Sequence, residues 1–361
     1  MRIPVLEHDD LLSDDPAARR RAADAVSAAF SGPGLVFVHG SPVVRAEVDQ
    51  LYDRFLEVLA RPAAEKAGWG GAHLWYQRGW TPPNTERAVE GGGQPDFKEC
   101  FFATPEDLDP EAVHLWPELY APNVWPRDAD AFREATLGVG RSLHGVGLRL
   151  LGACERALDL PPGALVDLTW GAASLTRLLE YLPLDEAQVA RRDQVLWGEE
   201  HTDFNLLTLL PGGRFFRNGI PGRPADGGGL YLRTRPTPEH PAGERIEGTA
   251  PAGCLVAQVG QQLEVLTGGT FQATPHGIVA PAEPGWIRTS VAHFVHVHAR
   301  TVMRPLSPFA HAAPRYAPPV LAGTYATKTL VDIGLAPASA LDQLGYRHYD
   351  RLSRLREIER G

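Results

Sequence analysis

Apolar residues recur every three or four positions in several segments of the first 160 residues, a spacing that predicts amphipathic helices. One predicted helix runs from about 42 to 60, and its apolar face consists of Val44, Val48, Leu51, Phe55 and Leu59. Another begins at Asp14-Asp15-Pro16, where acidic residues and a proline occupy the first turn, and ends near Ser31-Gly32. A long helix is predicted over 128–158.

The pattern changes after about residue 165, where short runs rich in apolar and β-branched residues alternate with glycine and proline. The runs are LTRLLEYL, HTDFNLLTLL, GGLYLR, GCLVAQVG, EVLTGGTFQA, HGIVAP and IRTSVAHFVHV. Short strands at this spacing are typical of a β-sandwich or barrel. Two more short strands are predicted over 3–6 and 35–38, and the chain becomes helical again after Pro318.

These segments predict a mixed α/β fold in a single large domain, 1–361, because no obvious linker divides the chain. The domain would have a helical N-terminal part over about 1–160, a double-sheet β core over about 165–300 and a helical C-terminal segment over about 320–360. The 37 glycines and 32 prolines agree with many turns between short strands.

Charge and cysteine usage limit the partners of the protein. The 35 basic and 44 acidic residues give a net charge of −9, which disfavours nucleic-acid binding because that requires a basic surface. The three cysteines form no CxxC pair, which indicates a reducing compartment. The chain has neither an apolar run of about 18 residues nor the apolar stretch of a secretory signal. We therefore expect a cytoplasmic monomer or homodimer whose partner is a small molecule, not nucleic acid or a membrane.

Two histidines and one aspartate are candidate metal ligands. His201 and Asp203 occupy positions i and i+2 of the run HTDFNLLTLL, and His276 lies in a second β-like run, TFQATPHGIVAP. If both runs are strands, the three side chains can enter the same barrel. Such ligands on one side of a metal leave the opposite positions open, as suits Fe(II) that binds O2 together with an organic chelate. A lone HxD pair is more often a surface or helix-capping pair, so the pattern needs a second feature.

Arg288 and Ser290, in GWIRTSVAHF, supply that second feature. They again occupy positions i and i+2 of one predicted strand, so a guanidinium and a hydroxyl share one face. The strand is strongly apolar, and an arginine buried there requires an anion. Because a guanidinium binds a carboxylate through two parallel hydrogen bonds, the pair is predicted to hold a carboxylate.

The order of HTD, LEVLTGGTFQATPHG and RTS resembles that of the isopenicillin N synthase-like, 2-oxoglutarate-dependent non-haem iron oxygenases. GWTPPNTE followed by PDFKECFF, PNVWP at 122–126 and HTDFNLLTLL are similar to further segments of that family, and the resemblance extends from about residue 3 to 298. The TGGTFQATPH segment is most similar to bacterial ethylene-forming-type members. The insertions RFFRNGIPGRPADGGG and RPTPEHPAGERIEG depart from the family pattern.

The resemblance implies a double-stranded β-helix (jelly-roll) core with Fe(II) on His201, Asp203 and His276. It also implies that Arg288 and Ser290 bind the C5 carboxylate of 2-oxoglutarate. No catalytic residue is expected apart from the three metal ligands. The implied activity is that of a dioxygenase. It would use O2 and 2-oxoglutarate to hydroxylate or otherwise oxidise a C–H bond, with release of succinate and CO2. An amino acid or a natural-product intermediate, in a biosynthetic role, is the expected substrate.

Six further residues are candidates for the pocket. Arg177 and Tyr181 lie in RLLEYLP, which resembles the tyrosine-proline element of the family with one extra residue, and are carried over to the cosubstrate site. Glu86, in the tryptophan- and glycine-rich segment 68–96, could bind a cationic substrate group or be a solvated loop acid. Trp80, Phe204 and His296 could line the substrate pocket, with a purely structural role as the alternative.

Two other functions stay open at this point. An oxidase of the isopenicillin N synthase type shares the fold and the Arg-x-Ser pair but takes all its electrons from the substrate. The second is a metal-binding jelly-roll of another class, such as a zinc hydrolase or a sugar-binding module. A hydrolase would need a nearby general base, and the HTD segment has no obvious one, although Glu199 and Glu200 are adjacent. The dependence on 2-oxoglutarate and the identity of the metal distinguish these functions.

Overall fold

Two facing β-sheets form the centre of the computed structural model, which describes residues 3–86, 96–191, 197–225, 227–234 and 240–343. The larger sheet consists of β1 (Val5–Glu7), β2 (Leu35–His39), β3 (Gly79–Thr81), β4 (Lys98–Ala103), β5 (Leu175–Tyr181), β7 (Leu207–Leu210), β8 (Arg214–Arg217), β9 (Ile220–Gly222), β12 (Cys254–Val259) and β14 (Trp286–Val295). The smaller sheet consists of β6 (Gly198–His201), β10 (Gly229–Arg233), β11 (Arg245–Glu247) and β13 (His276–Val279). A separate pair is formed by β15 (Val302–Met303) and β16 (Val320–Leu321).

The strand order is β1-β2-β12-β7-β14-β5-β4-β3 in the larger sheet and β11-β10-β13-β6 in the smaller sheet. Apart from the parallel pair β1–β2, the recorded strand pairs are antiparallel. β8 and β9 extend the larger sheet beside β14. The N-terminal strands thus belong to the same sheet as the core strands, which agrees with a single domain, although the domain boundaries stay a prediction.

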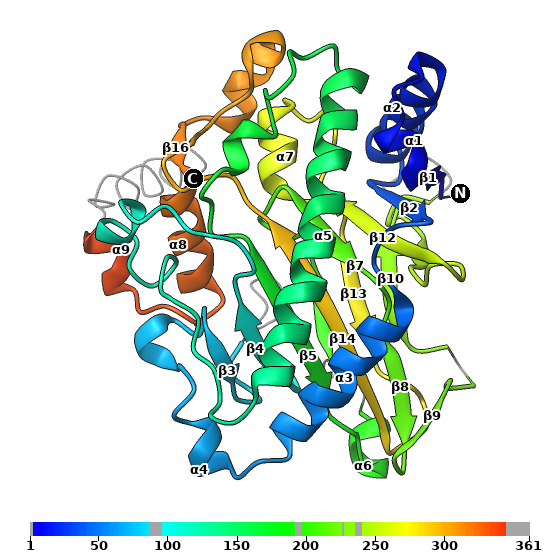
Figure 1. Cartoon of the computed structure of the whole chain (residues 1–361), viewed down its shortest axis with the longest axis vertical. Helices are drawn as coiled ribbons and strands as arrows, with labels where there is room; N and C mark the ends of the chain where they lie inside the picture. Colours follow the sequence, from blue (N-terminus) through cyan, green and yellow to red (C-terminus); the bar gives the residue numbers. More distant parts are fainter. Residues whose placement is uncertain (1–2, 87–95, 192–196, 226, 235–239, 344–361) are drawn as a thin grey trace.

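Helices cover the outer face of the larger sheet (Figure 1). The three helices expected from periodicity are present as α2 (Pro16–Ser31), α3 (Arg45–Leu59) and α5 (Asp130–Ala157). The remaining helices are α1 (His8–Leu12), α4 (Ala63–Lys66), α6 (Glu186–Val189), α7 (Gln261–Leu266), α8 (Ala322–Asp332) and α9 (Ser339–Gln343), with 3-10 segments η1 (Ala72–Leu74), η2 (Ala112–His114), η3 (Asp167–Thr169) and η4 (Ser307–Tyr316). No helix within the described ranges is both long enough and apolar enough to cross a membrane.

One predicted strand is a helix. The run EVLTGGTFQA was expected to be extended, but its first residues belong to α7, which ends before Gly268 and Gly269. Both glycines have positive φ angles, 59° and 82°, so the chain turns there instead of continuing as a strand. The helix expected after residue 343 lies outside the described residues.

The two faces of β14 have different roles. Thr289, Val291, His293 and Val295 are buried toward the helices, whereas Arg288, Ser290, Ala292 and Phe294 face the space between the two sheets. We call that space the interior. It is lined by apolar side chains from both sheets, so any polar group in it is enclosed by a largely dry wall.

A pair of buried histidines joins α5 to β14 on the helix-covered face. His144 Nδ1 lies 3.1 Å from His293 Nε2, and His293 Nδ1 lies 3.0 Å from the Thr176 hydroxyl. Burial lowers the pKa of His144 to about 4 and holds that of His293 well below its usual value. The pair is therefore neutral in the folded protein.

We expect the stability of the protein to fall as the pH drops below about 6.5, the unfolded-state pKa of histidine. Below that pH the unfolded chain binds protons that the folded chain cannot bind. Each histidine then costs up to about 1.4 kcal/mol of unfolding free energy per pH unit, down to its folded-state pKa. Thermal melts at intervals of about half a pH unit between pH 7.5 and pH 5 would measure this dependence of stability on pH. His144→Met should flatten it, whereas replacing the exposed His114 by glutamine should not.

Candidate metal centre and active site

Three potential metal ligands meet at one end of the interior. His201 is the last residue of β6 and His276 is the first residue of β13. The two residues are cross-strand partners, and the centroids of their rings lie 4.5 Å apart. Asp203 follows two residues after His201. One ligand atom from each of the three residues lies within 4.8 Å of the other two.

The route by which Asp203 arrives there differs from the expectation. His201 and Asp203 were predicted to share a strand, but β6 ends at His201 and Asp203 lies in the turn before β7. The backbone N–H of Gln261 donates to the Asp203 carbonyl at 2.8 Å, and this contact helps to hold the turn. The Asp203 carboxylate still points to the two histidines, so the three potential ligands come together although Asp203 does not share a strand with His201.

Both imidazoles are oriented for metal binding by backbone carbonyls. His201 Nδ1 lies 2.7 Å from the Glu199 carbonyl oxygen and His276 Nδ1 lies 3.0 Å from that of Thr274. With Nδ1 donating, each Nε2 keeps its lone pair. These Nε2 atoms face the Asp203 carboxylate, at 3.5 Å for His201 and 3.7 Å for His276. Two nitrogen donors and one oxygen donor on one side suit Fe(II) with open positions opposite.

The Asp203 carboxylate is held by two residues that sequence reasoning missed. The Thr208 hydroxyl donates to Asp203 Oδ2 at 2.6 Å and the Gln258 amide donates to the same oxygen at 2.9 Å. Burial alone would raise the pKa of Asp203, but the neighbouring imidazoles of His276 and His201 and the Thr208 hydroxyl lower it overall. A polar residue inside the apolar run LVAQV was the available signal for Gln258, because a buried amide requires a partner.

Arg288 and Ser290 lie side by side in the interior, as expected for neighbours on one strand face. Arg288 donates to the Ser290 hydroxyl at 3.1 Å, and the two residues are only 8% and 6% exposed. The guanidinium carbon lies 5.2 Å from the ring centroid of Tyr181 and 5.9 Å from that of Phe215. Among the described residues, no carboxylate is within ion-pair distance of Arg288. A buried guanidinium of this kind fits a ligand carboxylate.

Glu86 and Arg177 belong to a buried ion-pair cluster with Asp96 and Lys98. Arg177 donates to Glu86, Lys98 lies 3.1 Å from Glu86, and Lys98 also pairs with Asp96. Burial would raise the pKa of Glu86, but the two cations hold it at about 2. The cluster has two positive and two negative side chains, so Glu86 is neither a solvated loop acid nor an unpaired anion.

The remaining candidates lie in two different places. Phe204 and His296 line a cavity of about 30 Å³ that is also bordered by α8, and their ring centroids lie 5.2 Å apart. Trp80, in contrast, donates to Glu99 at 2.6 Å and packs with the helix-facing core. Trp80 is therefore not among the residues that we propose for the pocket.

Family comparisons agree with this arrangement. Residues 3–128 match the family model of the non-haem dioxygenase in morphine synthesis N-terminal region, and residues 176–297 match that of the 2OG-Fe(II) oxygenase superfamily. The second match contains all three potential ligands together with Arg288 and Ser290.

Individual relatives are distant in sequence. The chain is 24% identical to leucoanthocyanidin dioxygenase 2 of Oryza sativa subsp. japonica, over 76% of this chain and 66% of that protein. It is 26% identical to azadirone synthase LFS of Melia azedarach, over 68% of this chain and 70% of that protein. The chain thus spans about two thirds of the length of these relatives.

Solved structures share the fold over nearly the whole chain. A 2OG-Fe(II) oxygenase family protein from Caulobacter crescentus is 26% identical, with a TM-score of 0.72 over 92% of this chain and 99% of that chain. The dioxygenase for auxin oxidation in rice is 18% identical, with a TM-score of 0.63 over 94% and 98% of the two chains, which shows the fold alone. These likenesses confirm the predicted jelly-roll core. The chain therefore belongs to the 2OG-Fe(II) oxygenase superfamily, whose members are oxidoreductases that use Fe(II), 2-oxoglutarate and O2.

Proposed function

We propose that this protein couples the oxidative decarboxylation of 2-oxoglutarate to the oxidation of a C–H bond in a small molecule. One observation carries the proposal. Two imidazoles, a carboxylate and a buried guanidinium without a described carboxylate partner point into the same interior. Bound Fe(II) would supply the activation of O2.

Each residue of the site has a separate task in this proposal. His201, Asp203 and His276 would hold the metal, while Thr208 and Gln258 fix the orientation of the carboxylate. Arg288 and Ser290 would bind the C5 carboxylate of 2-oxoglutarate, with the Tyr181 ring beside the guanidinium. The apolar walls from both sheets would exclude water from the reaction.

The alternatives are less well supported. An oxidase that needs no 2-oxoglutarate also has the Arg-x-Ser pair, so Arg288 alone does not exclude it, but the match to the 2OG-Fe(II) oxygenase model and the dioxygenase names of the relatives do not favour it. A zinc hydrolase would need a general base, and Glu200, which is adjacent to His201, is already paired with Arg233 at 2.6 Å.

For the substrate we propose a compound of modest size, such as an amino acid or a natural-product intermediate. The names of the relatives, a leucoanthocyanidin dioxygenase and an azadirone synthase, are those of enzymes acting on small molecules. Phe204 and His296 would lie against the substrate, and burial lowers the pKa of His296 to about 4, so its ring is neutral. The balanced charges around Glu86 do not by themselves favour a cationic substrate, and membership of the ethylene-forming branch stays a prediction.

The test is succinate release by the anaerobically metal-loaded protein after O2 is added. We expect release to require both Fe(II) and 2-oxoglutarate, and to rise with a true substrate in a screen of amino acids and phenolic or terpenoid compounds. O2 uptake that needs a substrate but not 2-oxoglutarate would support the oxidase instead. Activity with Zn²⁺ and without O2 would support the hydrolase.

Replacing Glu86 by glutamine should uncouple the reaction. Arg177 and Lys98 would lose their shared anion and shift within the interior, whereas the metal ligands and Arg288 would be untouched. We expect metal and 2-oxoglutarate binding to be retained and the ratio of oxidised product to succinate to fall at least about tenfold, because small displacements of a bound substrate cost that much or more.

Glu99→Gln is the matched control for this variant. Glu99 is also a buried carboxylate in an ion pair, with Lys66 at 2.9 Å, but it lies on the helix-facing side of β4. Its replacement should alter stability and leave coupling unchanged. Equal coupling in the two variants would show that Glu86 has only a structural role.

The cellular setting is proposed from composition. A net charge of −9 argues against nucleic-acid partners, and all three cysteines are unpaired, which suits a reducing compartment such as the cytoplasm. We propose a monomer or homodimer without a membrane partner.

A further inference from the structure

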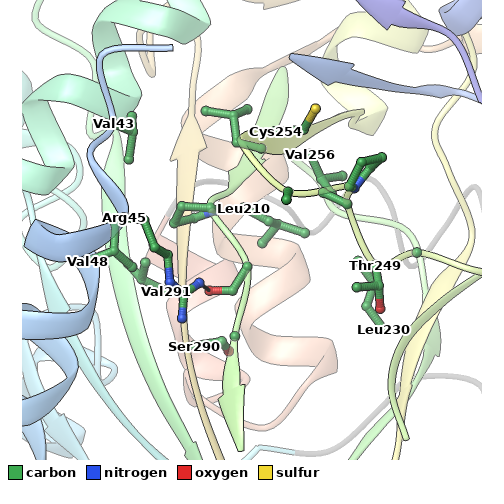
Figure 2. Close-up of a pocket in the computed structure, with 18 of the residues that line it drawn as sticks. Val43, Arg45, Val48, Leu210, Leu230, Thr249, Cys254, Val256, Ser290 and Val291 are labelled. Atoms are coloured by element: carbon green, nitrogen blue, oxygen red, sulfur yellow. Dashed lines mark hydrogen bonds between the residues drawn. The ribbon is translucent and has the colours of Figure 1, made fainter. Parts of the chain in front are cut away.

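A cavity of about 650 Å³ leads from Arg288 and Ser290 to the protein surface. Figure 2 shows it between side chains from α3 and the turn before it on one side and residues of the 249–256 segment on the other, with Ser290 in the lower part of the view. Exposed residues such as His39, Thr249 and Ala252 line its outer end. We call this space the clamp cavity. It is larger than a five-carbon 2-oxo acid requires, since volumes of about 300–1,000 Å³ hold drug-sized ligands.

The clamp cavity exists because the larger sheet is interrupted beside Ser290. β7 pairs with β14 at His293–Val295, and β8 pairs with β14 at Trp286–Thr289. Between β7 and β8 runs the segment Pro211-Gly212-Gly213, and no ladder pair to β14 is recorded for it within the described residues. The edge of β14 at Ser290–Ala292 is therefore left uncovered on this side.

Contacts with α3 hold the interruption open. The Gly212 carbonyl accepts a hydrogen bond from the Tyr52 hydroxyl at 2.6 Å and one from Arg45 at 3.4 Å. Gly213 lies so close to Arg288 that a Cβ there would be 2.9 Å from the guanidinium carbon. The segment is thus tied to the helix on one side and packed on the guanidinium on the other.

The charge of the clamp cavity suits an anion. Two arginines line it, Arg288 and Arg45, of which Arg45 pairs with Asp49 at 2.7 Å, and none of its described lining residues is acidic. The whole chain has 44 acidic residues and a net charge of −9, so a wall without a carboxylate is unusual for this protein. A path lined by one sign of charge raises the local concentration of ligands of the opposite sign.

The clamp cavity is separate from the approach to the metal. Its described lining contains none of the three metal-ligand candidates, and Phe204 and His296 line the other, smaller cavity. The metal site has its own contact with solvent, because the His201 side chain is 49% exposed.

We propose that 2-oxoglutarate enters and succinate leaves through the clamp cavity, while the substrate reaches the metal from the His201 side. This inference rests on the proposed function. The keto-acid end would enter first, and the trailing carboxylate would stop at Arg288 and Ser290, at the inner end of the cavity. Cosubstrate exchange would then not require release of the substrate or its product.

Tryptophan substitutions at the outer end test the route. In Thr249→Trp and Ala252→Trp, we expect the association and dissociation rates of 2-oxoglutarate to fall together, about tenfold, with Kd unchanged within about twofold, because a narrowed path raises the same barrier in both directions. The rates are measured anaerobically by stopped flow, from the visible charge-transfer absorption that appears when a 2-oxo acid chelates protein-bound Fe(II). Ala187→Trp, at an exposed site on α6, is the control and should match the wild type.

A charge reversal provides an independent arm. Arg45→Glu should slow association about tenfold at low salt and less at high salt. Arg54→Glu is the matched control, because Arg54 is also an exposed, ion-paired residue of α3 but does not line the cavity.

Wild-type rates in both tryptophan variants would overturn the proposed route and place cosubstrate entry on the His201 side. A changed Kd with an unchanged association rate would also overturn it. If the wild-type protein shows no absorption change with Fe(II) and 2-oxoglutarate, the proposed function fails instead, so the two failures are distinguishable.

Discussion

Replacing Asp203 by alanine is expected to abolish metal binding and succinate formation while leaving the protein folded. The carboxylate supplies the only oxygen donor of the described ligand group. Loss of even a residue that merely orients a metal ligand typically costs about 10–100-fold in metal affinity, so loss of the ligand itself should cost at least about 100-fold. The fold should persist, because the core around the site consists of apolar clusters that do not include Asp203. Metal content after anaerobic loading, titration with Co(II) and a thermal melt measure these effects.

Asp109 provides the control for that variant. Its carboxylate also pairs with a histidine, His298 at 3.0 Å, but the pair lies apart from the ligand group. Asp109→Ala should keep full metal content and activity. Full metal content in Asp203→Ala would refute the proposed ligand set. If Asp203→Ala does not fold, Asp203→Asn separates loss of folding from loss of metal, because asparagine keeps the shape of the side chain and its contact with Thr208.

Parts of the structure that follow from local pattern were predictable. β14 illustrates this, because alternation along IRTSVAHFV places Arg288 and Ser290 on one face, and the structure has them there. The three long helices follow from apolar spacing in the same way. α7 does not, because LEVL satisfies both a helical and a buried-strand pattern, and the turn that ends it depends on the two glycines that follow.

The sequence predicted which residues of single segments belong to the candidate site, but not the contacts that join distant segments there. His201, Asp203 and His276 could be chosen by residue type and order, yet Asp203 reaches the group through a turn that alternation does not describe. Thr208 and Gln258 contact Asp203 from two other strands, and that contact follows from the pairing of β12 with β7. Glu86 was a candidate because of its residue type, but its charge is set by Arg177 and Lys98, distant in sequence.

The clamp cavity was beyond sequence reasoning for a related reason. It depends on where β7 ends and β8 begins, and on contacts of Gly212 with a helix about 160 residues earlier in the chain. Pro211 and the two glycines after it indicate a turn, but a turn alone does not say which strand loses its neighbour.

Replacing Arg288 by alanine is expected to weaken 2-oxoglutarate binding by about 30-fold to a few thousand-fold. Truncating one partner of a buried, hydrogen-bonded charge pair costs roughly 2–5 kcal/mol, which corresponds to that range. Arg288 qualifies because it is 8% exposed and is not paired with a carboxylate of the described residues. Metal binding should be retained, since the guanidinium makes no contact with the ligand group.

Arg288→Lys distinguishes charge from geometry, because lysine keeps the charge but cannot make two parallel hydrogen bonds to a carboxylate. We expect its affinity for 2-oxoglutarate to lie between those of the wild type and of the alanine variant. Arg217→Ala is the control, since Arg217 lies on β8 at the same end of the sheet, pairs with Glu283 at 2.6 Å and is 40% exposed. Isothermal titration with Mn(II) in place of iron measures the affinities without turnover. If Arg288→Ala bound 2-oxoglutarate as tightly as the wild type, the carboxylate would have to be held elsewhere, and Arg177 is the next buried guanidinium of the interior to replace.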